Sequence, residues 1–393
     1  MKRGIIIKES VLYRQLDDSL TNTNIVLLAV CSIFLHYLLT AIILIGLSVY
    51  IATNKRTRNM IFVHKYAKSL VLFYILMNVV SIISKNWFGP IVGLAIMLAY
   101  VLGLFFRTVM TKELYERVLT LICIFSLTST SCAIAEKVVI PIFVKDYNTA
   151  RISAMFFHPN YFGTVISTVI IICAYKVLTR QGKTWVYYGI AAFNVISLYL
   201  CESMFAWIEV FVGIAILLIV LKKHQLLSIW MIAAVFAGFI IFILNIDIIP
   251  RLSEAELTIK LRLKIWNYSI KQIKNSLIFG YGPMSFAFKT YKMGNLVPHT
   301  HSIYLEAIMN YGVVGTLLSL LYFIRYYINV IKECFVKKHT LITSLILAIT
   351  VATLIHGLTD LTILWVQTLP LFLFILSGYG AYEKLSEQES EIF

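Results

Sequence analysis

Charged residues are scarce in this 393-residue chain, and their scarcity excludes an ordinary soluble protein. Only 13% of the residues are charged, whereas 60% are hydrophobic. Soluble domains carry about 25% charged residues. The apolar runs reach the roughly 20 residues that a helix needs to cross a bilayer. The sequence therefore predicts an all-α, polytopic membrane protein.

Cysteine pairs and metal-ligand clusters are also lacking. The six cysteines contain no CxxC motif and show no spacing typical of a disulfide framework. Most of them lie inside apolar runs, where a thiol packs as a small hydrophobic group. We therefore expect no disulfide, no metal and no cofactor. No cleavable signal peptide, internal repeat or low-complexity tract is evident.

Acidic residues are too few to balance the basic ones. The 34 lysines and arginines exceed the 19 acidic residues and give a net charge of +15. In a soluble protein this charge would suggest nucleic acid. In a membrane protein, basic residues flank the spans on the cytoplasmic side, so we expect contacts with membrane lipids and no nucleic-acid partner.

Long apolar segments predict about 12 transmembrane helices, with a large outer loop before the tenth. The first two segments are short, and we interpret them as a tight broken pair. The segments are 25–39, 40–52, 66–84, 88–106, 115–135, 160–178, 184–201, 203–221, 225–246, 302–324, 340–358 and 362–380.

Lysine and arginine in the short loops predict the orientation. The run NKRTRN and the pair Lys222 and Lys223 are typical of cytoplasmic loops. Both termini then lie inside, and segment 136–159 lies outside. The predicted organisation is a cytoplasmic segment 1–24, helices one to nine in 25–246, an extracytoplasmic basic loop 247–301, helices ten to twelve in 302–380 and a cytoplasmic tail 381–393.

The predicted outer loop 247–301 is rich in basic residues, against the usual bias. Within it, LTIKLRLKIWNYSIKQIKNSLIFG alternates basic and apolar residues, which predicts an interfacial amphipathic helix. Two interpretations stay open for its cations. They are either solvated, or they form an anion site for phosphate or a lipid headgroup.

The stretch VPHTHSIYLEAIMNYGVVG places two histidines directly before an apolar helix. Free N–H groups at the helix start favour neutral imidazole over imidazolium at His301. A neutral imidazole is what a general base needs. His299 would face the same side in an extended strand. The alternative is that both are interfacial residues with structural hydrogen bonds.

Further candidates lie on the helix that follows the histidines. Ser302 can act as its N-cap. Glu306 lies one turn into the span, where a carboxylate is costly unless it faces a polar cavity or pairs with a loop cation. Gly312 and Gly315 form a small face that allows close helix approach. Tyr304 is a supporting candidate on the same turn.

One spacing in this stretch resembles a family signature. His301 and Ser302, then nine residues, then Gly312 and Gly315 match H-[NSQ]-x9-G-x-x-G. That pattern is typical of the O-antigen ligase and Wzy-type polysaccharide polymerase superfamily. Looser similarities follow the family's order in ARISAMFFHPNYFG through Arg151, Pro159 and Asn160, in RLKIW followed by GYGP, and in HGLTD.

This resemblance covers about residues 25–380 and has one departure. Met204 follows Ser203 where the family often has arginine, so another cation must serve there. The resemblance implies a GT-C-like fold and inverting, metal-independent glycosyl transfer from a polyprenyl-diphosphate-linked donor to a glycan acceptor. His301 would be the base, and Arg262 and Arg151 would bind the diphosphate.

The remaining polar candidates receive smaller roles from the resemblance. His299 would support the base. Asn160 would either cap a helix or touch sugar. Asp360 is interpreted as structural first, and His158 and His356 as packing or hydrogen-bonding residues.

Three functions remain in competition, besides a structural or regulatory membrane component. The first is a polymerase of the cytoplasmic (inner) membrane of a bacterium that joins lipid-linked repeat units into capsule, exopolysaccharide or O-antigen on the outer face, with a possible chain-length regulator as partner. The second is a ligase that moves finished glycan to another acceptor. The third is a flippase for the lipid-linked oligosaccharide, which the lack of inverted repeats disfavours.

Overall fold

The computed structural model describes residues 21–62, 67–144, 150–244, 255–293, 297–336 and 340–392, and every regular element in these ranges is a helix. The all-α prediction is therefore confirmed for this part of the chain. Residues 1–20 of the predicted N-terminal segment, 247–254 and 294–296 of the predicted outer loop, and Phe393 lie outside the described residues.

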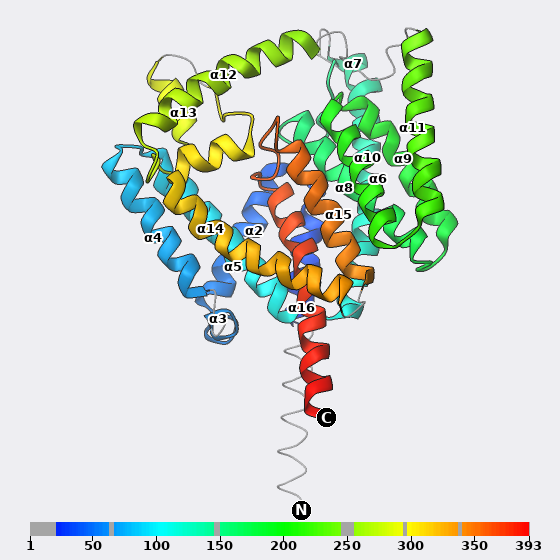
Figure 1. Cartoon of the computed structure of the whole chain (residues 1–393), viewed down its shortest axis with the longest axis horizontal. Coiled ribbons are helices and arrows are strands. Elements are labelled where there is room, and N and C mark those ends of the chain that lie inside the picture. Colours follow the sequence, from blue (N-terminus) through cyan, green and yellow to red (C-terminus); the bar gives the residue numbers. More distant parts are fainter. Residues whose placement is uncertain are drawn as a thin grey trace, which may run out of the picture.

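The helices form one bundle, and two further helices lie across one end of it (Figure 1). They are Thr21–Ser32, α2 (Tyr37–Thr53), α3 (Lys55–Phe62), α4 (Ala67–Ile83), α5 (Phe88–Val109), α6 (Lys112–Val138), α7 (Ile140–Phe143), α8 (Pro159–Leu178), α9 (Thr184–Leu200), α10 (Met204–Val220), α11 (His224–Leu244), α12 (Ala255–Asn275), α13 (Ser285–Lys292), α14 (Ile303–Phe335), α15 (Thr340–His356) and α16 (Thr368–Ile392).

Each apolar segment predicted from the sequence overlaps one of these helices, but the predicted number of membrane spans is not confirmed. By length and composition, four described helices could cross a membrane alone, or five if α2 and α3 are counted as one span bent by 84°. The apolar stretches of the other helices have 10–17 residues. Short helices of this kind reach across a bilayer only where neighbours or local thinning compensate.

Two element boundaries differ from the prediction. The last apolar segment begins its helix at Thr368 instead of residue 362, because Trp365 donates its backbone N–H to the Thr368 hydroxyl and the chain turns there. The helix after the histidines extends to Phe335 and has non-helical backbone angles at Gly312. The predicted break near residue 40 lies at 33–36, between Thr21–Ser32 and α2.

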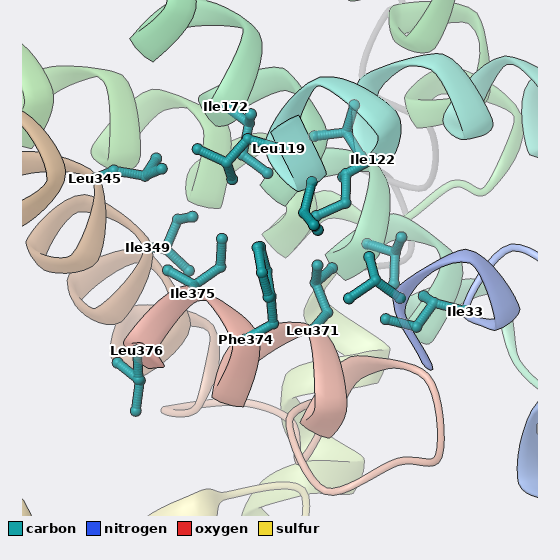
Figure 2. Close-up of a cluster of buried hydrophobic side chains, with 14 of the residues drawn as sticks. Ile33, Leu119, Ile122, Ile172, Leu345, Ile349, Leu371, Phe374, Ile375 and Leu376 are labelled. Carbon is teal, nitrogen blue, oxygen red and sulfur yellow. The ribbon is translucent and has the colours of Figure 1, made fainter. Parts of the chain in front are cut away.

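The buried core is built around α16. Phe374 and Ile375 of α16 lie between Leu119 of α6 and Ile349 of α15 (Figure 2). The Tyr115 hydroxyl donates a hydrogen bond of 3.0 Å to the Ile375 carbonyl in the same region. Because lipid tails are as apolar as leucine, close packing and such hydrogen bonds stabilise helix contacts in a membrane more than burial does.

The amphipathic stretch of the predicted outer loop forms α12, which lies with α13 across one end of the bundle (Figure 1). Both contact the first half of α14. Lys260 and Leu257 are exposed on α12, whereas Ile273 packs with Phe286 and Met309. This arrangement brings α12 against the segment that carries the two histidines.

Candidate functional site

The two histidines lie in an extended segment that ends at α14. His301 has a φ of +52°, an uncommon conformation for a residue with a side chain, which costs energy and is frequent at functional sites. Its carbonyl accepts a hydrogen bond of 3.4 Å from the Trp266 indole of α12. At the start of α14, the backbone N–H of Ile303 donates to the Gly357 carbonyl. This bond joins the segment to the turn after α15.

Asp360, in the turn after α15, accepts a hydrogen bond from His301. The distance from His301 Nδ1 to Asp360 Oδ1 is 3.2 Å. The same carboxylate also accepts from the Leu361 backbone N–H and from the Asn160 side-chain amide. Burial raises the pKa of the Asp360 carboxyl, but the hydrogen bond from His301 and the nearby imidazoles outweigh it and hold that pKa well below its usual range.

An ionised Asp360 determines which nitrogen of His301 can act as a base. The carboxylate accepts, so Nδ1 of His301 must carry a proton, and the lone pair lies on Nε2. A carboxylate that orients an imidazole in this way also stabilises the imidazolium that forms when the ring takes a proton. The His301 side chain is 29% exposed, so the ring can meet a substrate.

His299 lies beside this pair but in a different protonation environment. Its Nδ1 accepts a hydrogen bond of 3.2 Å from the backbone N–H of His301, which puts its own proton on Nε2, 3.8 Å from Asp360 Oδ1. Burial lowers the pKa of His299 to about 4, even though Asp360 acts in the opposite direction. His299 is therefore neutral near pH 7 and positions the backbone of His301.

The three residues also have the composition of a metal site that no spacing in the sequence indicated. One ligand atom each from His299, His301 and Asp360 lie within 4.8 Å of one another. The cluster cannot be recognised from the sequence, because Asp360 is 59 residues from His301. A metal ion would have to displace the imidazole protons that face Asp360, because ligating nitrogens must be deprotonated. The hydrogen bonds of these residues are those of protonated imidazole nitrogens and a carboxylate acceptor, and they fit a site for proton transfer.

The predicted diphosphate ligands Arg151 and Arg262 lie in one pocket. Arg151 precedes α8, and Arg262 lies on α12 with its guanidinium 5.6 Å from the centre of the Phe205 ring. The pocket has a volume of about 370 Å³ including its open mouth. It is lined by Arg151, Asn160, Glu202, Ser203, Met204, Phe205, Thr258, Arg262 and His356. The lining includes Met204, the position of the family's missing arginine.

A chain of hydrogen bonds links this pocket to the base. Arg151 Nη2 lies 2.5 Å from Asn160 Oδ1, and the amide nitrogen of Asn160 donates to Asp360. Asn160 does not cap α8, because the His158 side chain accepts its backbone N–H and occupies the N-cap position. The sequence predicted Arg151 and Asn160 as candidates but not this connection to His301.

Three other predicted residues support the geometry at the start of α14. Ser302 occupies the N-cap position, but its side chain makes no capping hydrogen bond. Glu306 is buried and accepts from the Thr300 backbone N–H and the Asn310 amide, so its hydrogen-bond partners are neutral groups and not the loop cation that was one of the two options from the sequence. The Tyr304 hydroxyl donates to the Leu354 carbonyl of α15.

Gly312 and Gly315 lie where α14 meets its neighbours. Gly312 has a φ of +60° and interrupts the helix, and a Cβ there would lie 2.3 Å from the Ile278 carbonyl oxygen. The broken turn is stabilised by backbone N–H groups of 313 and 314, which donate to the carbonyls of 277 and 278. The close partner of Gly312 is therefore a loop instead of the helix that the GxxG spacing suggested. A Cβ at Gly315 would lie 2.8 Å from Cβ of Tyr311 and 3.7 Å from the Phe73 ring of α4.

Sequence reasoning missed two carboxylates. Asp360 was interpreted as structural, although it contacts the proposed base. Glu209 was not singled out, although a carboxylate within the apolar run MFAWIEVFVG is a signal in a membrane protein. It lies 3.1 Å from His356 Nδ1.

The comparison with family models matches this part of the chain. Residues 189–320 match the model described as O-Antigen ligase. The matched range contains most of α9, all of α10 to α13, both histidines, Arg262 and the break at Gly312. The comparison with curated proteins gives no match. With the apolar helices, the family indicates a multi-pass membrane protein of the glycosyltransferase kind. The match over residues 189–320 supports the resemblance of this chain to the O-antigen ligase and Wzy-type polymerase superfamily.

Proposed function

We propose that this protein is an inverting glycosyltransferase that polymerises polyprenyl-diphosphate-linked oligosaccharide repeat units on the outer face of the bacterial cytoplasmic membrane. The observation that supports this best is the position of the His301–Asp360 pair beside a pocket with two arginines. The reaction needs a general base for the acceptor hydroxyl and cations that bind the diphosphate of the donor.

In the proposed step, an acceptor hydroxyl attacks the anomeric carbon of the donor sugar. A new C–O bond forms as the bond between that carbon and the diphosphate oxygen breaks, and the bonding electron pair leaves with the lipid diphosphate. The hydroxyl proton passes to Nε2 of His301, and Asp360 stabilises the imidazolium. Attack from the face opposite the leaving group inverts the anomeric centre.

Arg151 and Arg262 would stabilise the charge that develops on the leaving diphosphate. Guanidinium groups bind phosphate oxygens with paired hydrogen bonds and keep their charge at any physiological pH. Preorganised cations at a developing charge are commonly the largest catalytic contribution. In this arrangement Arg151 supplies the cation that the family often places at the position of Met204.

An apolar cavity next to the pair would hold a polyprenyl chain. It has a volume of about 1260 Å³ including its opening and lies between α2, α5, the start of α14 and segment 361–370. Leu361, which follows Asp360, is part of its wall. A hydrocarbon chain in this cavity would therefore approach the proposed base from the membrane side.

The second candidate function is ligase-type transfer of finished glycan to another acceptor, which the description of the matched family favours. Both functions use the same donor chemistry and the same residues. A flippase would not need an imidazole held by a carboxylate, so the His301–Asp360 pair argues against it.

The test uses the purified protein in lipid discs with a lipid-linked repeat unit, and separates the glycolipid products on a gel. We expect a ladder of longer glycans from the wild type, with and without a chelator. Replacement His301→Ala, Asp360→Asn or Arg262→Ala should slow ladder formation by about 10²- to 10⁴-fold, the usual loss for a general base or an electrostatic stabiliser.

A matched control is Tyr188→Phe, because that side chain is 63% exposed near the start of α9. It should keep the ladder. Extension of a second glycan acceptor without a ladder would select the ligase. A ladder that persists at the wild-type rate in His301→Ala would refute the assignment of the base.

A further inference from the structure

A second histidine–carboxylate pair lies next to the arginine pocket. His356 at the end of α15 has its Nδ1 3.1 Å from Oε1 of Glu209 on α10, and both side chains are at most 2% exposed. Ser167 Oγ of α8 lies 2.5 Å from the other oxygen of Glu209. An ionisable group buried among membrane helices is costly and is often functional. The proposed mechanism uses neither residue of this pair.

The ring of His356 reaches the arginine pocket. His356 is one of the residues that line the pocket. Its ring stacks on Phe205 at 5.8 Å and 21°, and the guanidinium of Arg262 lies over the same Phe205 ring. The hydrogen bonds that the structure gives the His356 ring, to Glu209 and Thr164, use Nδ1. Nε2 is therefore the ring nitrogen available to a ligand.

The pocket lacks positive charge for the ligand that it is proposed to hold. A diphosphate diester is a dianion. Arg151 and Arg262 line the pocket, but Glu202 lines it too and offsets one of the two positive charges. A protonated His356 would add an N–H donor, on Nε2, to the lining of this pocket.

We infer that His356, protonated and held by Glu209, is a third cationic ligand of the donor diphosphate. Nε2–H of the ring donates to a phosphate oxygen, while Nδ1–H donates to Glu209. Glu209 is then a positioning residue, which holds the proton and the orientation of the ring. This inference rests on the proposed function, because it takes the same pocket and the same donor.

Groups on four elements act on the ring. Glu209 faces it from α10, with Oε1 3.1 Å from Nδ1, and Asp360 lies in the turn after α15. Arg262 of α12 lies over the Phe205 ring on which His356 stacks. From α8, the Thr164 hydroxyl lies 3.3 Å from Nδ1. The charged group in hydrogen-bond contact with the ring is therefore a carboxylate, which stabilises an imidazolium.

The test measures binding of dimethyl diphosphate, a diester whose charge is constant from pH 5.5 to pH 8, to the full-length protein in lipid discs. Titration calorimetry at both pH values needs no turnover. We expect the wild-type affinity to fall several-fold as the pH rises and the imidazolium loses its proton. His356→Gln should bind about 10-fold more weakly at pH 5.5, the usual loss of a charge-assisted hydrogen bond, and lose the pH dependence. Glu209→Gln should behave in the same way.

Two control variants separate His356 from other histidines. His224→Gln, at the start of α11, should keep the wild-type affinity and pH dependence. His301→Gln should keep the pH dependence. A His356→Gln protein that keeps both wild-type values would overturn the inference, as would a pH dependence that disappears in His301→Gln instead.

If His356→Gln does not fold, the inference can still be tested by a direct measurement on the wild type. Nitrogen NMR of histidine-labelled protein, with His356 assigned by its absence in His356→Asn, reports the protonation of the ring near pH 6.5. A neutral ring in the presence of the diester would refute the inference. If the diester binds as expected but no glycan is transferred, the proposed function fails while the three-cation site stands. No binding by the wild type at either pH refutes the site itself.

Discussion

At the scale of single residues, two neighbouring imidazoles share one carboxylate but differ in what they can do. His301 is partly exposed, has a strained backbone and donates Nδ1–H to Asp360. His299 is buried and accepts the backbone N–H of His301. The exposed ring keeps a free nitrogen for a substrate, and the buried ring holds the backbone that positions it.

The neutral state of His299 predicts a pH dependence of stability. Burial lowers the pKa of His299 to about 4, whereas an unfolded histidine titrates near 6.5. Between these values the unfolded state binds the proton and the folded state does not, so stability is full above about pH 6.5 and falls as the pH drops toward 4. We expect the thermal midpoint of the wild type in lipid discs, measured by tryptophan fluorescence, to be lower at pH 4.5 than at pH 7.

His299→Gln should have a flatter profile over that range. His36→Gln, which changes an exposed histidine at the start of α2, should keep the wild-type slope. The loss from Asp360 begins near the ordinary pKa of an aspartate, about 3.9, where the unfolded state binds the proton, and grows toward lower pH, so most of it lies below this window. Equal slopes in wild type and His299→Gln would show that His299 is not buried as the structure has it.

At the scale of elements, the break in α14 at Gly312 packs against the GYGP turn that follows α12. Gly280 and Gly282 of the GYGP turn both have positive φ, as Gly312 does. The backbone N–H groups of 281 and 282 donate to the carbonyls of 309 and 310, which the break frees. Hence the turn after α12 pairs with α14 through the backbone, and this pairing sets the distance between Arg262 and His301.

Gly312→Ala should therefore damage both stability and transfer. The added Cβ meets the Ile278 carbonyl oxygen at 2.3 Å, in a backbone conformation that already costs about 1–3 kcal/mol for a residue with a side chain. We expect a lower thermal midpoint and slower transfer. The control is Gly189→Ala of α9, where no atom lies within 4 Å of the new Cβ. A Gly312→Ala protein as stable as this control would refute the role of the kink.

At the scale of the whole molecule, the candidate site lies toward the end of the bundle that α12 and α13 cover (Figure 1). The turn between α10 and α11 lies at the other end, as does the C-terminal part of α16. The basic residues of α12 would screen the site from the aqueous phase, and the apolar cavity below Asp360 opens among membrane helices.

The orientation proposed from the basic loops predicts a labelling pattern. Lys260→Cys on α12 should react with a membrane-impermeant thiol reagent on intact cells, since the Lys260 side chain is 65% exposed. Lys223→Cys, in the exposed turn before α11, should react only after the membrane is opened. The native protein serves as the background control for its six cysteines. The reverse pattern would put the site on the cytoplasmic side.

Much of this organisation was determined by the sequence itself. Apolar runs and periodicity predicted helices because a chain in lipid must satisfy its backbone hydrogen bonds within the helix. The spacing of His301, Ser302, Gly312 and Gly315 is local in sequence, so it indicated the family resemblance and the proposed base. Arg151, Asn160 and Arg262 were candidates from short motifs, and the fold brings them to one pocket.

The tertiary structure alone decided which groups face one another. Asp360 meets His301 across 59 residues, and Glu209 meets His356 across 147, and no local pattern records such distances. The break at Gly312 depends on a loop that packs against it, so the GxxG spacing could not distinguish a loop from a helix as its neighbour. Periodicity reports which side of a helix is apolar, whereas the contacts of buried polar groups depend on how the helices pack, and those contacts determine the chemistry of this site.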